Sequence, residues 1–151
     1  MKNPMVSDRD IEIAARLRTV IHRLVKLLRR ETHGEGQLSL TERSVLGSLY
    51  QQGHLLPTEL AQIEKVTTQS MSQIINHLHA LRLIGKAPSG EDKRKVWLSL
   101  TPSGRAYVED NRQRKQEWLA RALHEKVSPR EKELLLGALD ILTKIIEEKN
   151  S

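Results

Sequence analysis

Amide and hydroxyl side chains gather on one predicted helix at about residues 67–81. Apolar Met71, Ile74, Ile75 and Leu78 recur there at helical spacing, which predicts that one face is buried. The remaining positions carry short polar groups: Thr68, Gln69, Ser70, Ser72, Gln73 and Asn76. Asn and Gln amides can pair with the edge of adenine, and hydroxyl groups suit phosphates or bases. This composition favours a helix that reads DNA bases, although the polar face of an ordinary surface helix looks the same.

Three adjacent cations, Lys93, Arg94 and Lys95, form the tip of a predicted β-hairpin. They follow a turn-rich stretch and precede residues 96–100, where apolar and polar side chains partly alternate. A basic hairpin beside a DNA-reading helix would contact the phosphate backbone or enter the narrow minor groove, where Arg is favoured. The alternative is a solvated turn in which Asp92 merely pairs with Arg94. We expect Asp92 to orient Arg94 and the arginine to contact DNA.

The spacing of the potentially catalytic or metal-binding residues along the sequence does not fit either role. Of the six histidines, His77 and His79 are only two residues apart, but on a helix they diverge and cannot share a metal ion. The chain has no glycine-rich phosphate loop, no nucleophile motif and no clustered carboxylate pair. The absence of cysteine excludes disulfides, thiolate ligands and cysteine-based redox sensing. We therefore expect no catalytic residues, no cofactor and no bound metal.

Apolar periodicity and capping residues define the elements that must position the polar groups. Helices are expected at residues 8–30 and 41–53, after Leu56-Pro57, at 67–81 and 102–126, and from residue 129, with a hairpin at 85–100. The expected N-caps include Ser7, Thr58, Thr101 and Ser128. The order predicts a mainly α fold with a small β-hairpin wing. It consists of a winged helix-turn-helix lobe at residues 41–100 and a further helical region.

Net charge supports an anionic partner only weakly. The 151-residue chain has a net charge of +6 and a pI near 9.8. Residues 1–33 have eight Lys/Arg against four Asp/Glu, whereas residues 34–104 have seven against six. No run approaches the roughly 18 apolar residues of a membrane span, and the polar N-terminus lacks the apolar segment of a signal peptide. We expect a cytoplasmic protein with no membrane partner.

Several short motifs resemble the multiple antibiotic resistance regulator (MarR) family of bacterial transcription factors. They are Leu60-Ala61, residues 66–78, Leu83-Ile84, the wing Asp92-Lys93-Arg94 and Leu100-Thr101-Pro102-Ser103-Gly104. The Asp-x-Arg wing followed by Leu-Thr-x-x-Gly is the most specific part, and the resemblance extends over nearly the whole chain. Two positions depart from the family pattern. Arg82 replaces the usual glycine before Leu-Ile, so the recognition helix loses its glycine C-cap, and Lys86 stands where Arg is common.

The resemblance implies a single domain at residues 1–151 that forms a homodimer through helices at residues 8–33 and 102–149. The dimer would bind a pseudo-palindromic operator in double-stranded DNA, with its two recognition helices roughly 34 Å apart. The apolar faces of residues 8–30 and 129–148 are wider than the winged lobe could cover, which supports a dimer. In the alternative, these helices cover each other in a monomer.

The implied function is transcription regulation by a ligand-responsive repressor. Family members often respond to a small aromatic or anionic effector in a pocket between the dimer region and the DNA-binding lobe. The candidate pocket residues here are Arg16, His22 and His54. Because there is no cysteine, the thiol-oxidation switch of one branch of the family is excluded. The competing function is a winged-helix module that binds protein or RNA without an operator, but its wing would be apolar or shortened rather than basic.

Overall fold

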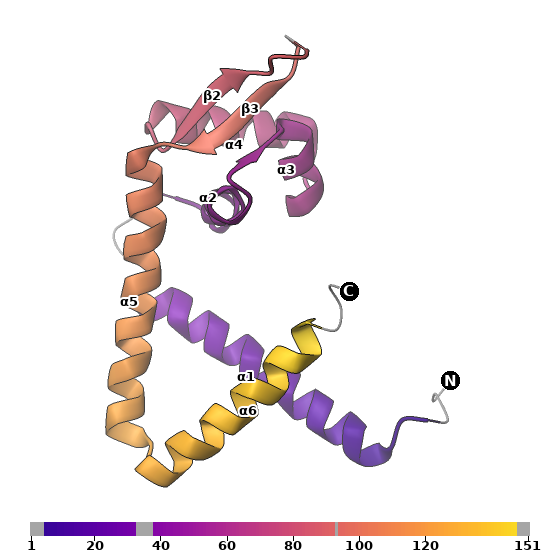
Figure 1. Cartoon of the computed structure of the whole chain (residues 1–151), viewed down its shortest axis with the longest axis vertical. Helices are drawn as coiled ribbons and strands as arrows, with labels where there is room; N and C mark the ends of the chain where they lie inside the picture. Colours follow the sequence, from indigo (N-terminus) through magenta and orange to yellow (C-terminus); the bar gives the residue numbers. More distant parts are fainter. Residues whose placement is uncertain (1–4, 33–37, 93, 148–151) are drawn as a thin grey trace. The chain divides into compact units, whose positions relative to one another are not determined.

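The computed structural model describes residues 5–32, 38–92 and 94–147 (Figure 1). It divides into two compact units. One consists of Met1–Thr32 together with Arg114–Ser151, and the other of His33–Gln113. The predicted winged lobe at residues 41–100 lies entirely within the second unit.

Helices and a small sheet make up the unit His33–Gln113 (Figure 1). Three helices precede the wing: α2 (Leu40–Gln52), α3 (Pro57–Glu64) and α4 (Thr68–Ala80). Three antiparallel strands pair in the order β1-β3-β2: β1 (His54–Leu55), β2 (Ile84–Pro88) and β3 (Val96–Leu100). The first part of α5 (Pro102–Lys126) follows β3 directly. The predicted mainly α fold with a β-hairpin wing is confirmed.

The sheet contains one strand that the sequence analysis missed. The expected hairpin of β2 and β3 is present, and β1 adds a third strand on the other side of β3. Gly53 ends α2 with a φ of 84°, in the left-handed region that glycine adopts readily. The chain then turns so that Leu55 pairs with Leu98 of β3. A strand of two residues is too short to show alternation, so no sequence pattern indicates it.

An aliphatic core holds the lobe together. Its fully buried side chains come from the three helices and the two longer strands: Val45, Leu46, Leu49, Leu60, Met71, Leu78, Ile84 and Leu98. Burying one such side chain contributes about 1.5–3 kcal/mol. Of the four residues of α4 that periodicity predicts to be buried, Met71, Ile75 and Leu78 are buried, whereas Ile74 is only partly buried against the core. This buried face fixes the rotation of α4 about its own axis.

One helix starts differently from its prediction. Capping hydroxyl groups accept backbone N–H groups at the three other predicted caps: Ser7, Thr101 and Ser128. Thr58, by contrast, does not cap α3. That helix already begins at Pro57, before the predicted cap Thr58, and the missing N–H of Pro57 needs no partner at the first helical position. The carboxylate of Glu59 instead accepts the N–H of Leu56 at 2.8 Å.

Thr101 joins the end of α4 to the start of α5. Its hydroxyl donates to the carbonyl of Arg82 at 2.6 Å and accepts the N–H of Gly104 at 3.0 Å. Its own N–H donates to the carbonyl of Leu83 at 3.1 Å. Arg82 has a φ of 59°, which is the left-handed conformation that a glycine would supply more cheaply. The turn after α4 therefore holds a non-glycine residue in the left-handed conformation.

Glu42, only 8% exposed, connects α2 to α4. One carboxylate oxygen accepts the N–H of Ser39 at 2.8 Å and completes a capping box at the start of α2. The other lies 2.5 Å from Nδ1 of His77 in the last turn of α4. Burial alone raises the pKa of Glu42, but the hydrogen bonds from His77 and Ser39 and the charge of His77 together lower it below its ordinary value.

Tyr50 of α2 attaches the first part of α5 to the lobe. The guanidinium carbons of Arg112 and Arg105 lie 4.3 Å and 5.2 Å from the centre of its ring. Its hydroxyl donates to Glu109 at 3.3 Å. These contacts bind α5 to the lobe as far as Arg112.

The other unit contains α1 (Asp8–Glu31), α6 (Pro129–Glu147) and the rest of α5. Neither α1 nor α6 has a buried residue. Large apolar side chains are exposed along both helices, among them Val20 at 60%, Leu134 at 69% and Ile146 at 65%. Extended exposed apolar surface marks an interaction site. The predicted wide apolar faces are therefore present and uncovered in the single chain.

Replacing Gly104 by Ala should destabilise the lobe. A Cβ there would lie 1.9 Å from the carbonyl oxygen of Leu83, which is backbone and already accepts the N–H of Thr101. We expect a loss of about 1–3 kcal/mol or more in the free energy of unfolding, measured by urea denaturation. Gly47→Ala is the matched control, because no atom lies within 4 Å of its Cβ and Ala is the better helix former. Equal effects of the two substitutions would contradict the close approach at Gly104.

Acid should remove the contribution of Glu42 to stability. Because its native pKa lies below the ordinary value of 4.5, the unfolded chain binds this proton more readily. The contribution is complete above pH 4.5 and disappears as the pH falls through the lowered native pKa. Glu42→Gln should cost about 1–3 kcal/mol at pH 7 and flatten the fall in stability below pH 4.5, measured by denaturation at several pH values. An unchanged acid profile would show that the carboxylate is not held in this way.

Candidate nucleic-acid interface

A tight turn leads from α3 into α4. Lys65 ends α3 in the left-handed conformation, with a φ of 55°. The N–H of Val66 donates back to the carbonyl of Ala61 at 3.1 Å, which closes the turn. Thr67 then caps α4 by accepting the N–H of Ser70 at 3.1 Å. A short helix, a tight turn and a longer helix form the helix-turn-helix arrangement.

The face of α4 opposite its buried residues carries a polar stripe, which consists of Gln69, Ser72, Gln73 and Asn76. All four are exposed, and their spacing of three and four residues places them on one side of the helix. Within the described residues, the Gln69 and Gln73 amides make no hydrogen bond to the rest of the chain. Both amides thus have a donor and an acceptor available for a base edge.

The hydroxyl groups beside the polar stripe are partly engaged within α4. Ser70 Oγ accepts the hydroxyl of Thr67 at 3.0 Å and keeps its own O–H for an outside acceptor. Ser72 Oγ donates to the carbonyl of Thr68 at 2.9 Å. Ser72 must release this bond before it can donate to a phosphate, whereas Ser70 need not. The exposed Thr68 lies in the first turn of the helix.

Main-chain hydrogen bonds shape the wing tip. Ser89 N–H donates to the carbonyl of Lys95 at 2.8 Å, and Lys95 N–H donates to the carbonyl of Asp92 at 3.0 Å. The Asp92 carboxylate accepts the backbone N–H of Arg94 at 3.0 Å. The expected contact between Asp92 and Arg94 thus involves the main chain, and the exposed Arg94 guanidinium has no acidic partner in the described part of the chain. Lys93 lies outside the described residues.

Lys86 of β2 adds a cation beside α4 that the sequence analysis did not include in the site. Its Nζ donates to Oδ1 of Asn76 at 3.4 Å. Lys86 pairs in register with Leu98, which is buried beneath the sheet. Residues directly opposite in an antiparallel pair point to the same face, so this register directs Lys86 towards the helices. Register is not readable from one sequence, where Lys86 is visible only as a departure from the family pattern.

The structure does not bring the three predicted effector residues together within one unit. Arg16 and His22 lie on α1, whereas His54 belongs to the unit His33–Gln113. The ring of His54 meets the ring of Trp97 edge to face, with centroids 4.7 Å apart. The assignment of these residues to a pocket stays a prediction.

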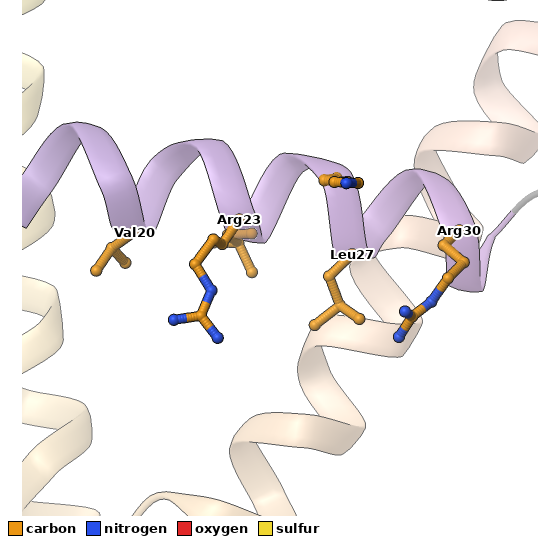
Figure 2. Close-up of a pocket in the computed structure, with 6 residues that line it drawn as sticks. Val20, Arg23, Leu27 and Arg30 are labelled. Atoms are coloured by element: carbon orange, nitrogen blue, oxygen red, sulfur yellow. The ribbon is translucent and has the colours of Figure 1, made fainter.

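An open groove of about 750 Å³ runs along α1 (Figure 2). Its lining combines three apolar and three cationic side chains: Val20, Leu24, Leu27, Arg23, Lys26 and Arg30. Figure 2 shows Val20, Arg23, Leu27 and Arg30 on the same side of the helix. The three predicted effector residues do not line this groove.

Among residues 5–32, 38–92 and 94–147, no three His, Asp or Glu side chains gather where they could hold a metal ion. No helix in these ranges is both long and apolar enough to cross a membrane.

Comparisons with known proteins agree with the geometry of the lobe. A model of the MarR family matches residues 37–95. An HTH-type transcriptional regulator of Mycobacterium tuberculosis is 31% identical over 141 residues, which cover 93% of this chain and 97% of the relative. A solved structure from Pseudomonas aeruginosa is 29% identical with a TM-score of 0.79, covering 93% of this chain and 99% of that one. A mutant of S. aureus MepR bound to an oligodeoxyribonucleotide shares the fold, at 21% identity, a TM-score of 0.66 and coverage of 89% and 97%.

The match to the mycobacterial relative extends well beyond the winged lobe, because it covers 93% of the chain. The aligned residues therefore include those of the helices outside the lobe. The family consists of transcription regulators, and its members that match here are not enzymes, in agreement with the expectation from the sequence. The chain belongs to the MarR family of winged helix-turn-helix transcriptional regulators.

Proposed function

We propose that a homodimer of this chain binds a pseudo-palindromic operator in double-stranded DNA, with α4 in the major groove and the wing against the backbone or in the minor groove. The polar stripe of α4 carries this proposal. The stripe is exposed on the side of α4 opposite the core. The major groove is wide enough for one helix and presents a distinct pattern of hydrogen-bond donors and acceptors for each base pair. The solved complex of MepR with an oligodeoxyribonucleotide supports DNA as the partner.

The polar groups divide into base-reading and backbone-binding roles. Gln69, Gln73 and Asn76 read base edges: the two glutamine amides offer both a donor and an acceptor, and Asn76, whose Oδ1 accepts from Lys86, offers its NH₂ donor. Thr68, Ser70 and Ser72 contact phosphates or bases near the N-terminal half of α4, where the helix dipole favours anions. The wing cations neutralise phosphate charge: Lys93, Arg94 and Lys95.

The second copy covers the apolar faces of α1 and α6. These helices have no buried residue in the single chain, and exposed apolar surface of this extent is costly unless a partner covers it. A two-fold dimer presents two recognition helices to one side of the duplex, which matches a pseudo-palindromic operator.

Binding of the operator represses transcription and responds to a small aromatic or anionic effector. The three cations Arg23, Lys26 and Arg30 along α1 support an anionic ligand. Arg16, His22 and His54 remain the predicted pocket residues. The protein acts in the cytoplasm, where bacterial DNA is found.

Arg94 and Gln73 should affect DNA binding in different ways. Arg94→Ala should weaken binding on all duplex sequences and reduce the dependence of log K on log salt by about 1, because a phosphate contact releases a counterion. Gln73→Ala should instead lower the preference for one base position by about 1–3 kcal/mol. Both are measured by fluorescence anisotropy on matched and single-mismatch duplexes at several salt concentrations.

The contrast between the two variants tests whether Arg94 contacts the DNA backbone and Gln73 reads a base. Unchanged duplex affinity in Arg94→Ala would remove the wing from the interface. An equal loss on every sequence in Gln73→Ala would make that residue a backbone contact. Preferential binding of single-stranded RNA by the unsubstituted protein would favour the competing RNA-interaction function.

Charge introduced into the apolar face of α6 should dissociate the dimer. Leu139→Glu buries a carboxylate in the proposed interface and should raise the dimer dissociation constant at least about tenfold, which corresponds to about 1.4 kcal/mol. Ile63→Glu in α3 is the matched control, since Ile63 is 47% exposed and Leu139 is 48% exposed. Sedimentation velocity should show a monomer for the first variant only. A dimer that survives Leu139→Glu would argue against this interface.

A further inference from the structure

Asn76 differs from the two glutamines of the polar stripe because its amide already has a partner. Lys86 Nζ lies 3.4 Å from Asn76 Oδ1. The contact is positioned by the sheet, since Lys86 pairs with the fully buried Leu98 and so emerges beside α4. Both Lys86 and Asn76 are exposed, so the pair lies at the surface of the lobe and not in its core.

This contact fixes which way the Asn76 amide points. The ammonium group of Lys has three donors and no acceptor, so it attracts the carbonyl oxygen and not the NH₂ group. With Oδ1 turned towards Lys86, the Nδ2 group is directed away from the cation. The pair therefore presents donors, namely the two N–H bonds of the amide and the remaining N–H bonds of the ammonium. Gln69 and Gln73 have no such neighbour within the described residues.

A surface that offers only donors discriminates between purines. Guanine presents two acceptors in the major groove, N7 and O6, whereas adenine presents N7 and an NH₂ donor. The adenine NH₂ needs the Asn oxygen as its acceptor, and here that oxygen faces a cation. The positive charge of Lys86 also favours the electron-rich edge of guanine. An unpaired Asn would instead be free to pair with adenine.

We propose that Lys86 and Asn76 act together as a reader of guanine, with Lys86 as the residue that sets the specificity of Asn76. This rests on the proposed function, because it requires α4 to lie in the major groove. Lys86 acts in two ways: it holds the Asn76 amide in one orientation, and its positive charge attracts the edge of guanine. In the described part of the chain, no other residue of the polar stripe is paired with a cation.

Selection from a randomised duplex DNA library, followed by sequencing, tests this pairing. The unsubstituted chain is compared with Asn76→Ala, Lys86→Met and Lys86→Arg. The base position that loses its preference in Asn76→Ala should prefer guanine in the unsubstituted chain. Lys86→Met should lower that preference about tenfold and raise acceptance of adenine at this position only. Lys86→Arg retains a cationic donor and should retain guanine. Circular dichroism of each variant checks that the lobe is folded.

Three results would overturn the proposal that Lys86 and Asn76 together read guanine. The first is a preference for adenine at the Asn76 position in the unsubstituted chain. The second is an unchanged motif in Lys86→Met, and the third is a loss of affinity there that is equal on all sequences, which would make Lys86 a phosphate contact. In these cases the unsubstituted chain still selects a motif and the proposed function stands. If it selects no motif at all, the proposed function fails as well. Lys95→Met serves as a comparison, because a wing cation should change affinity without changing base preference.

Discussion

The hydroxyl of Thr101 binds the chain at two points, the carbonyl of Arg82 just after α4 and the N–H of Gly104 in the first turn of α5. This is possible only because Gly104 has no Cβ, which would otherwise lie 1.9 Å from the Leu83 carbonyl oxygen. The recognition helix, the last strand of the wing and the start of α5 therefore meet at one place. The hydrogen bonds of Thr101 therefore connect the end of α4 and the last strand of the wing to the first turn of α5.

Two further contacts orient the lobe around this link. Glu42 at the start of α2 is hydrogen-bonded to His77 in the last turn of α4. The ring of Tyr50 on α2 contacts Arg105 and Arg112 of α5. With the apolar face of α4 held in the core, its polar stripe has to point outward. Residues 34–104 are nearly neutral in net charge, so the proposed DNA binding rests on the placement of amides and wing cations and not on bulk charge.

The helices were predictable because their signals are periodic and local. The spacing of Met71, Ile75 and Leu78 predicts the buried face of α4 correctly, and Ser7 caps α1 as expected. Features that depend on distant parts of the chain were not predictable. The two-residue strand β1 exists only because β3 offers it a partner. At α3 two local start signals competed, and the backbone followed Pro57 and Glu59 rather than Thr58.

In the candidate site, too, local features were predictable from the sequence and contacts between distant residues were not. Which residues of α4 face outward follows from periodicity, but which of them are already hydrogen-bonded does not. Ser72 is bonded to its own helix, and Asn76 is bonded to Lys86 from another strand. The left-handed conformation of Arg82 likewise follows from the tertiary contact of its carbonyl with Thr101, which overrides the preference of an arginine. Sequence alone identifies the polar groups and leaves their partners open.

The proposed assembly is a two-fold reader: each copy supplies a recognition helix and a wing held by the lobe, and the two copies cover each other's exposed apolar faces on α1 and α6. Hydroxyl-radical footprinting on an operator selected from the organism's own genome tests this most directly. The account predicts two related patches of protection whose centres are about 10–10.5 base pairs apart, symmetric about the centre of the site. A single patch of protection, from one protomer bound to one half-site, would contradict it.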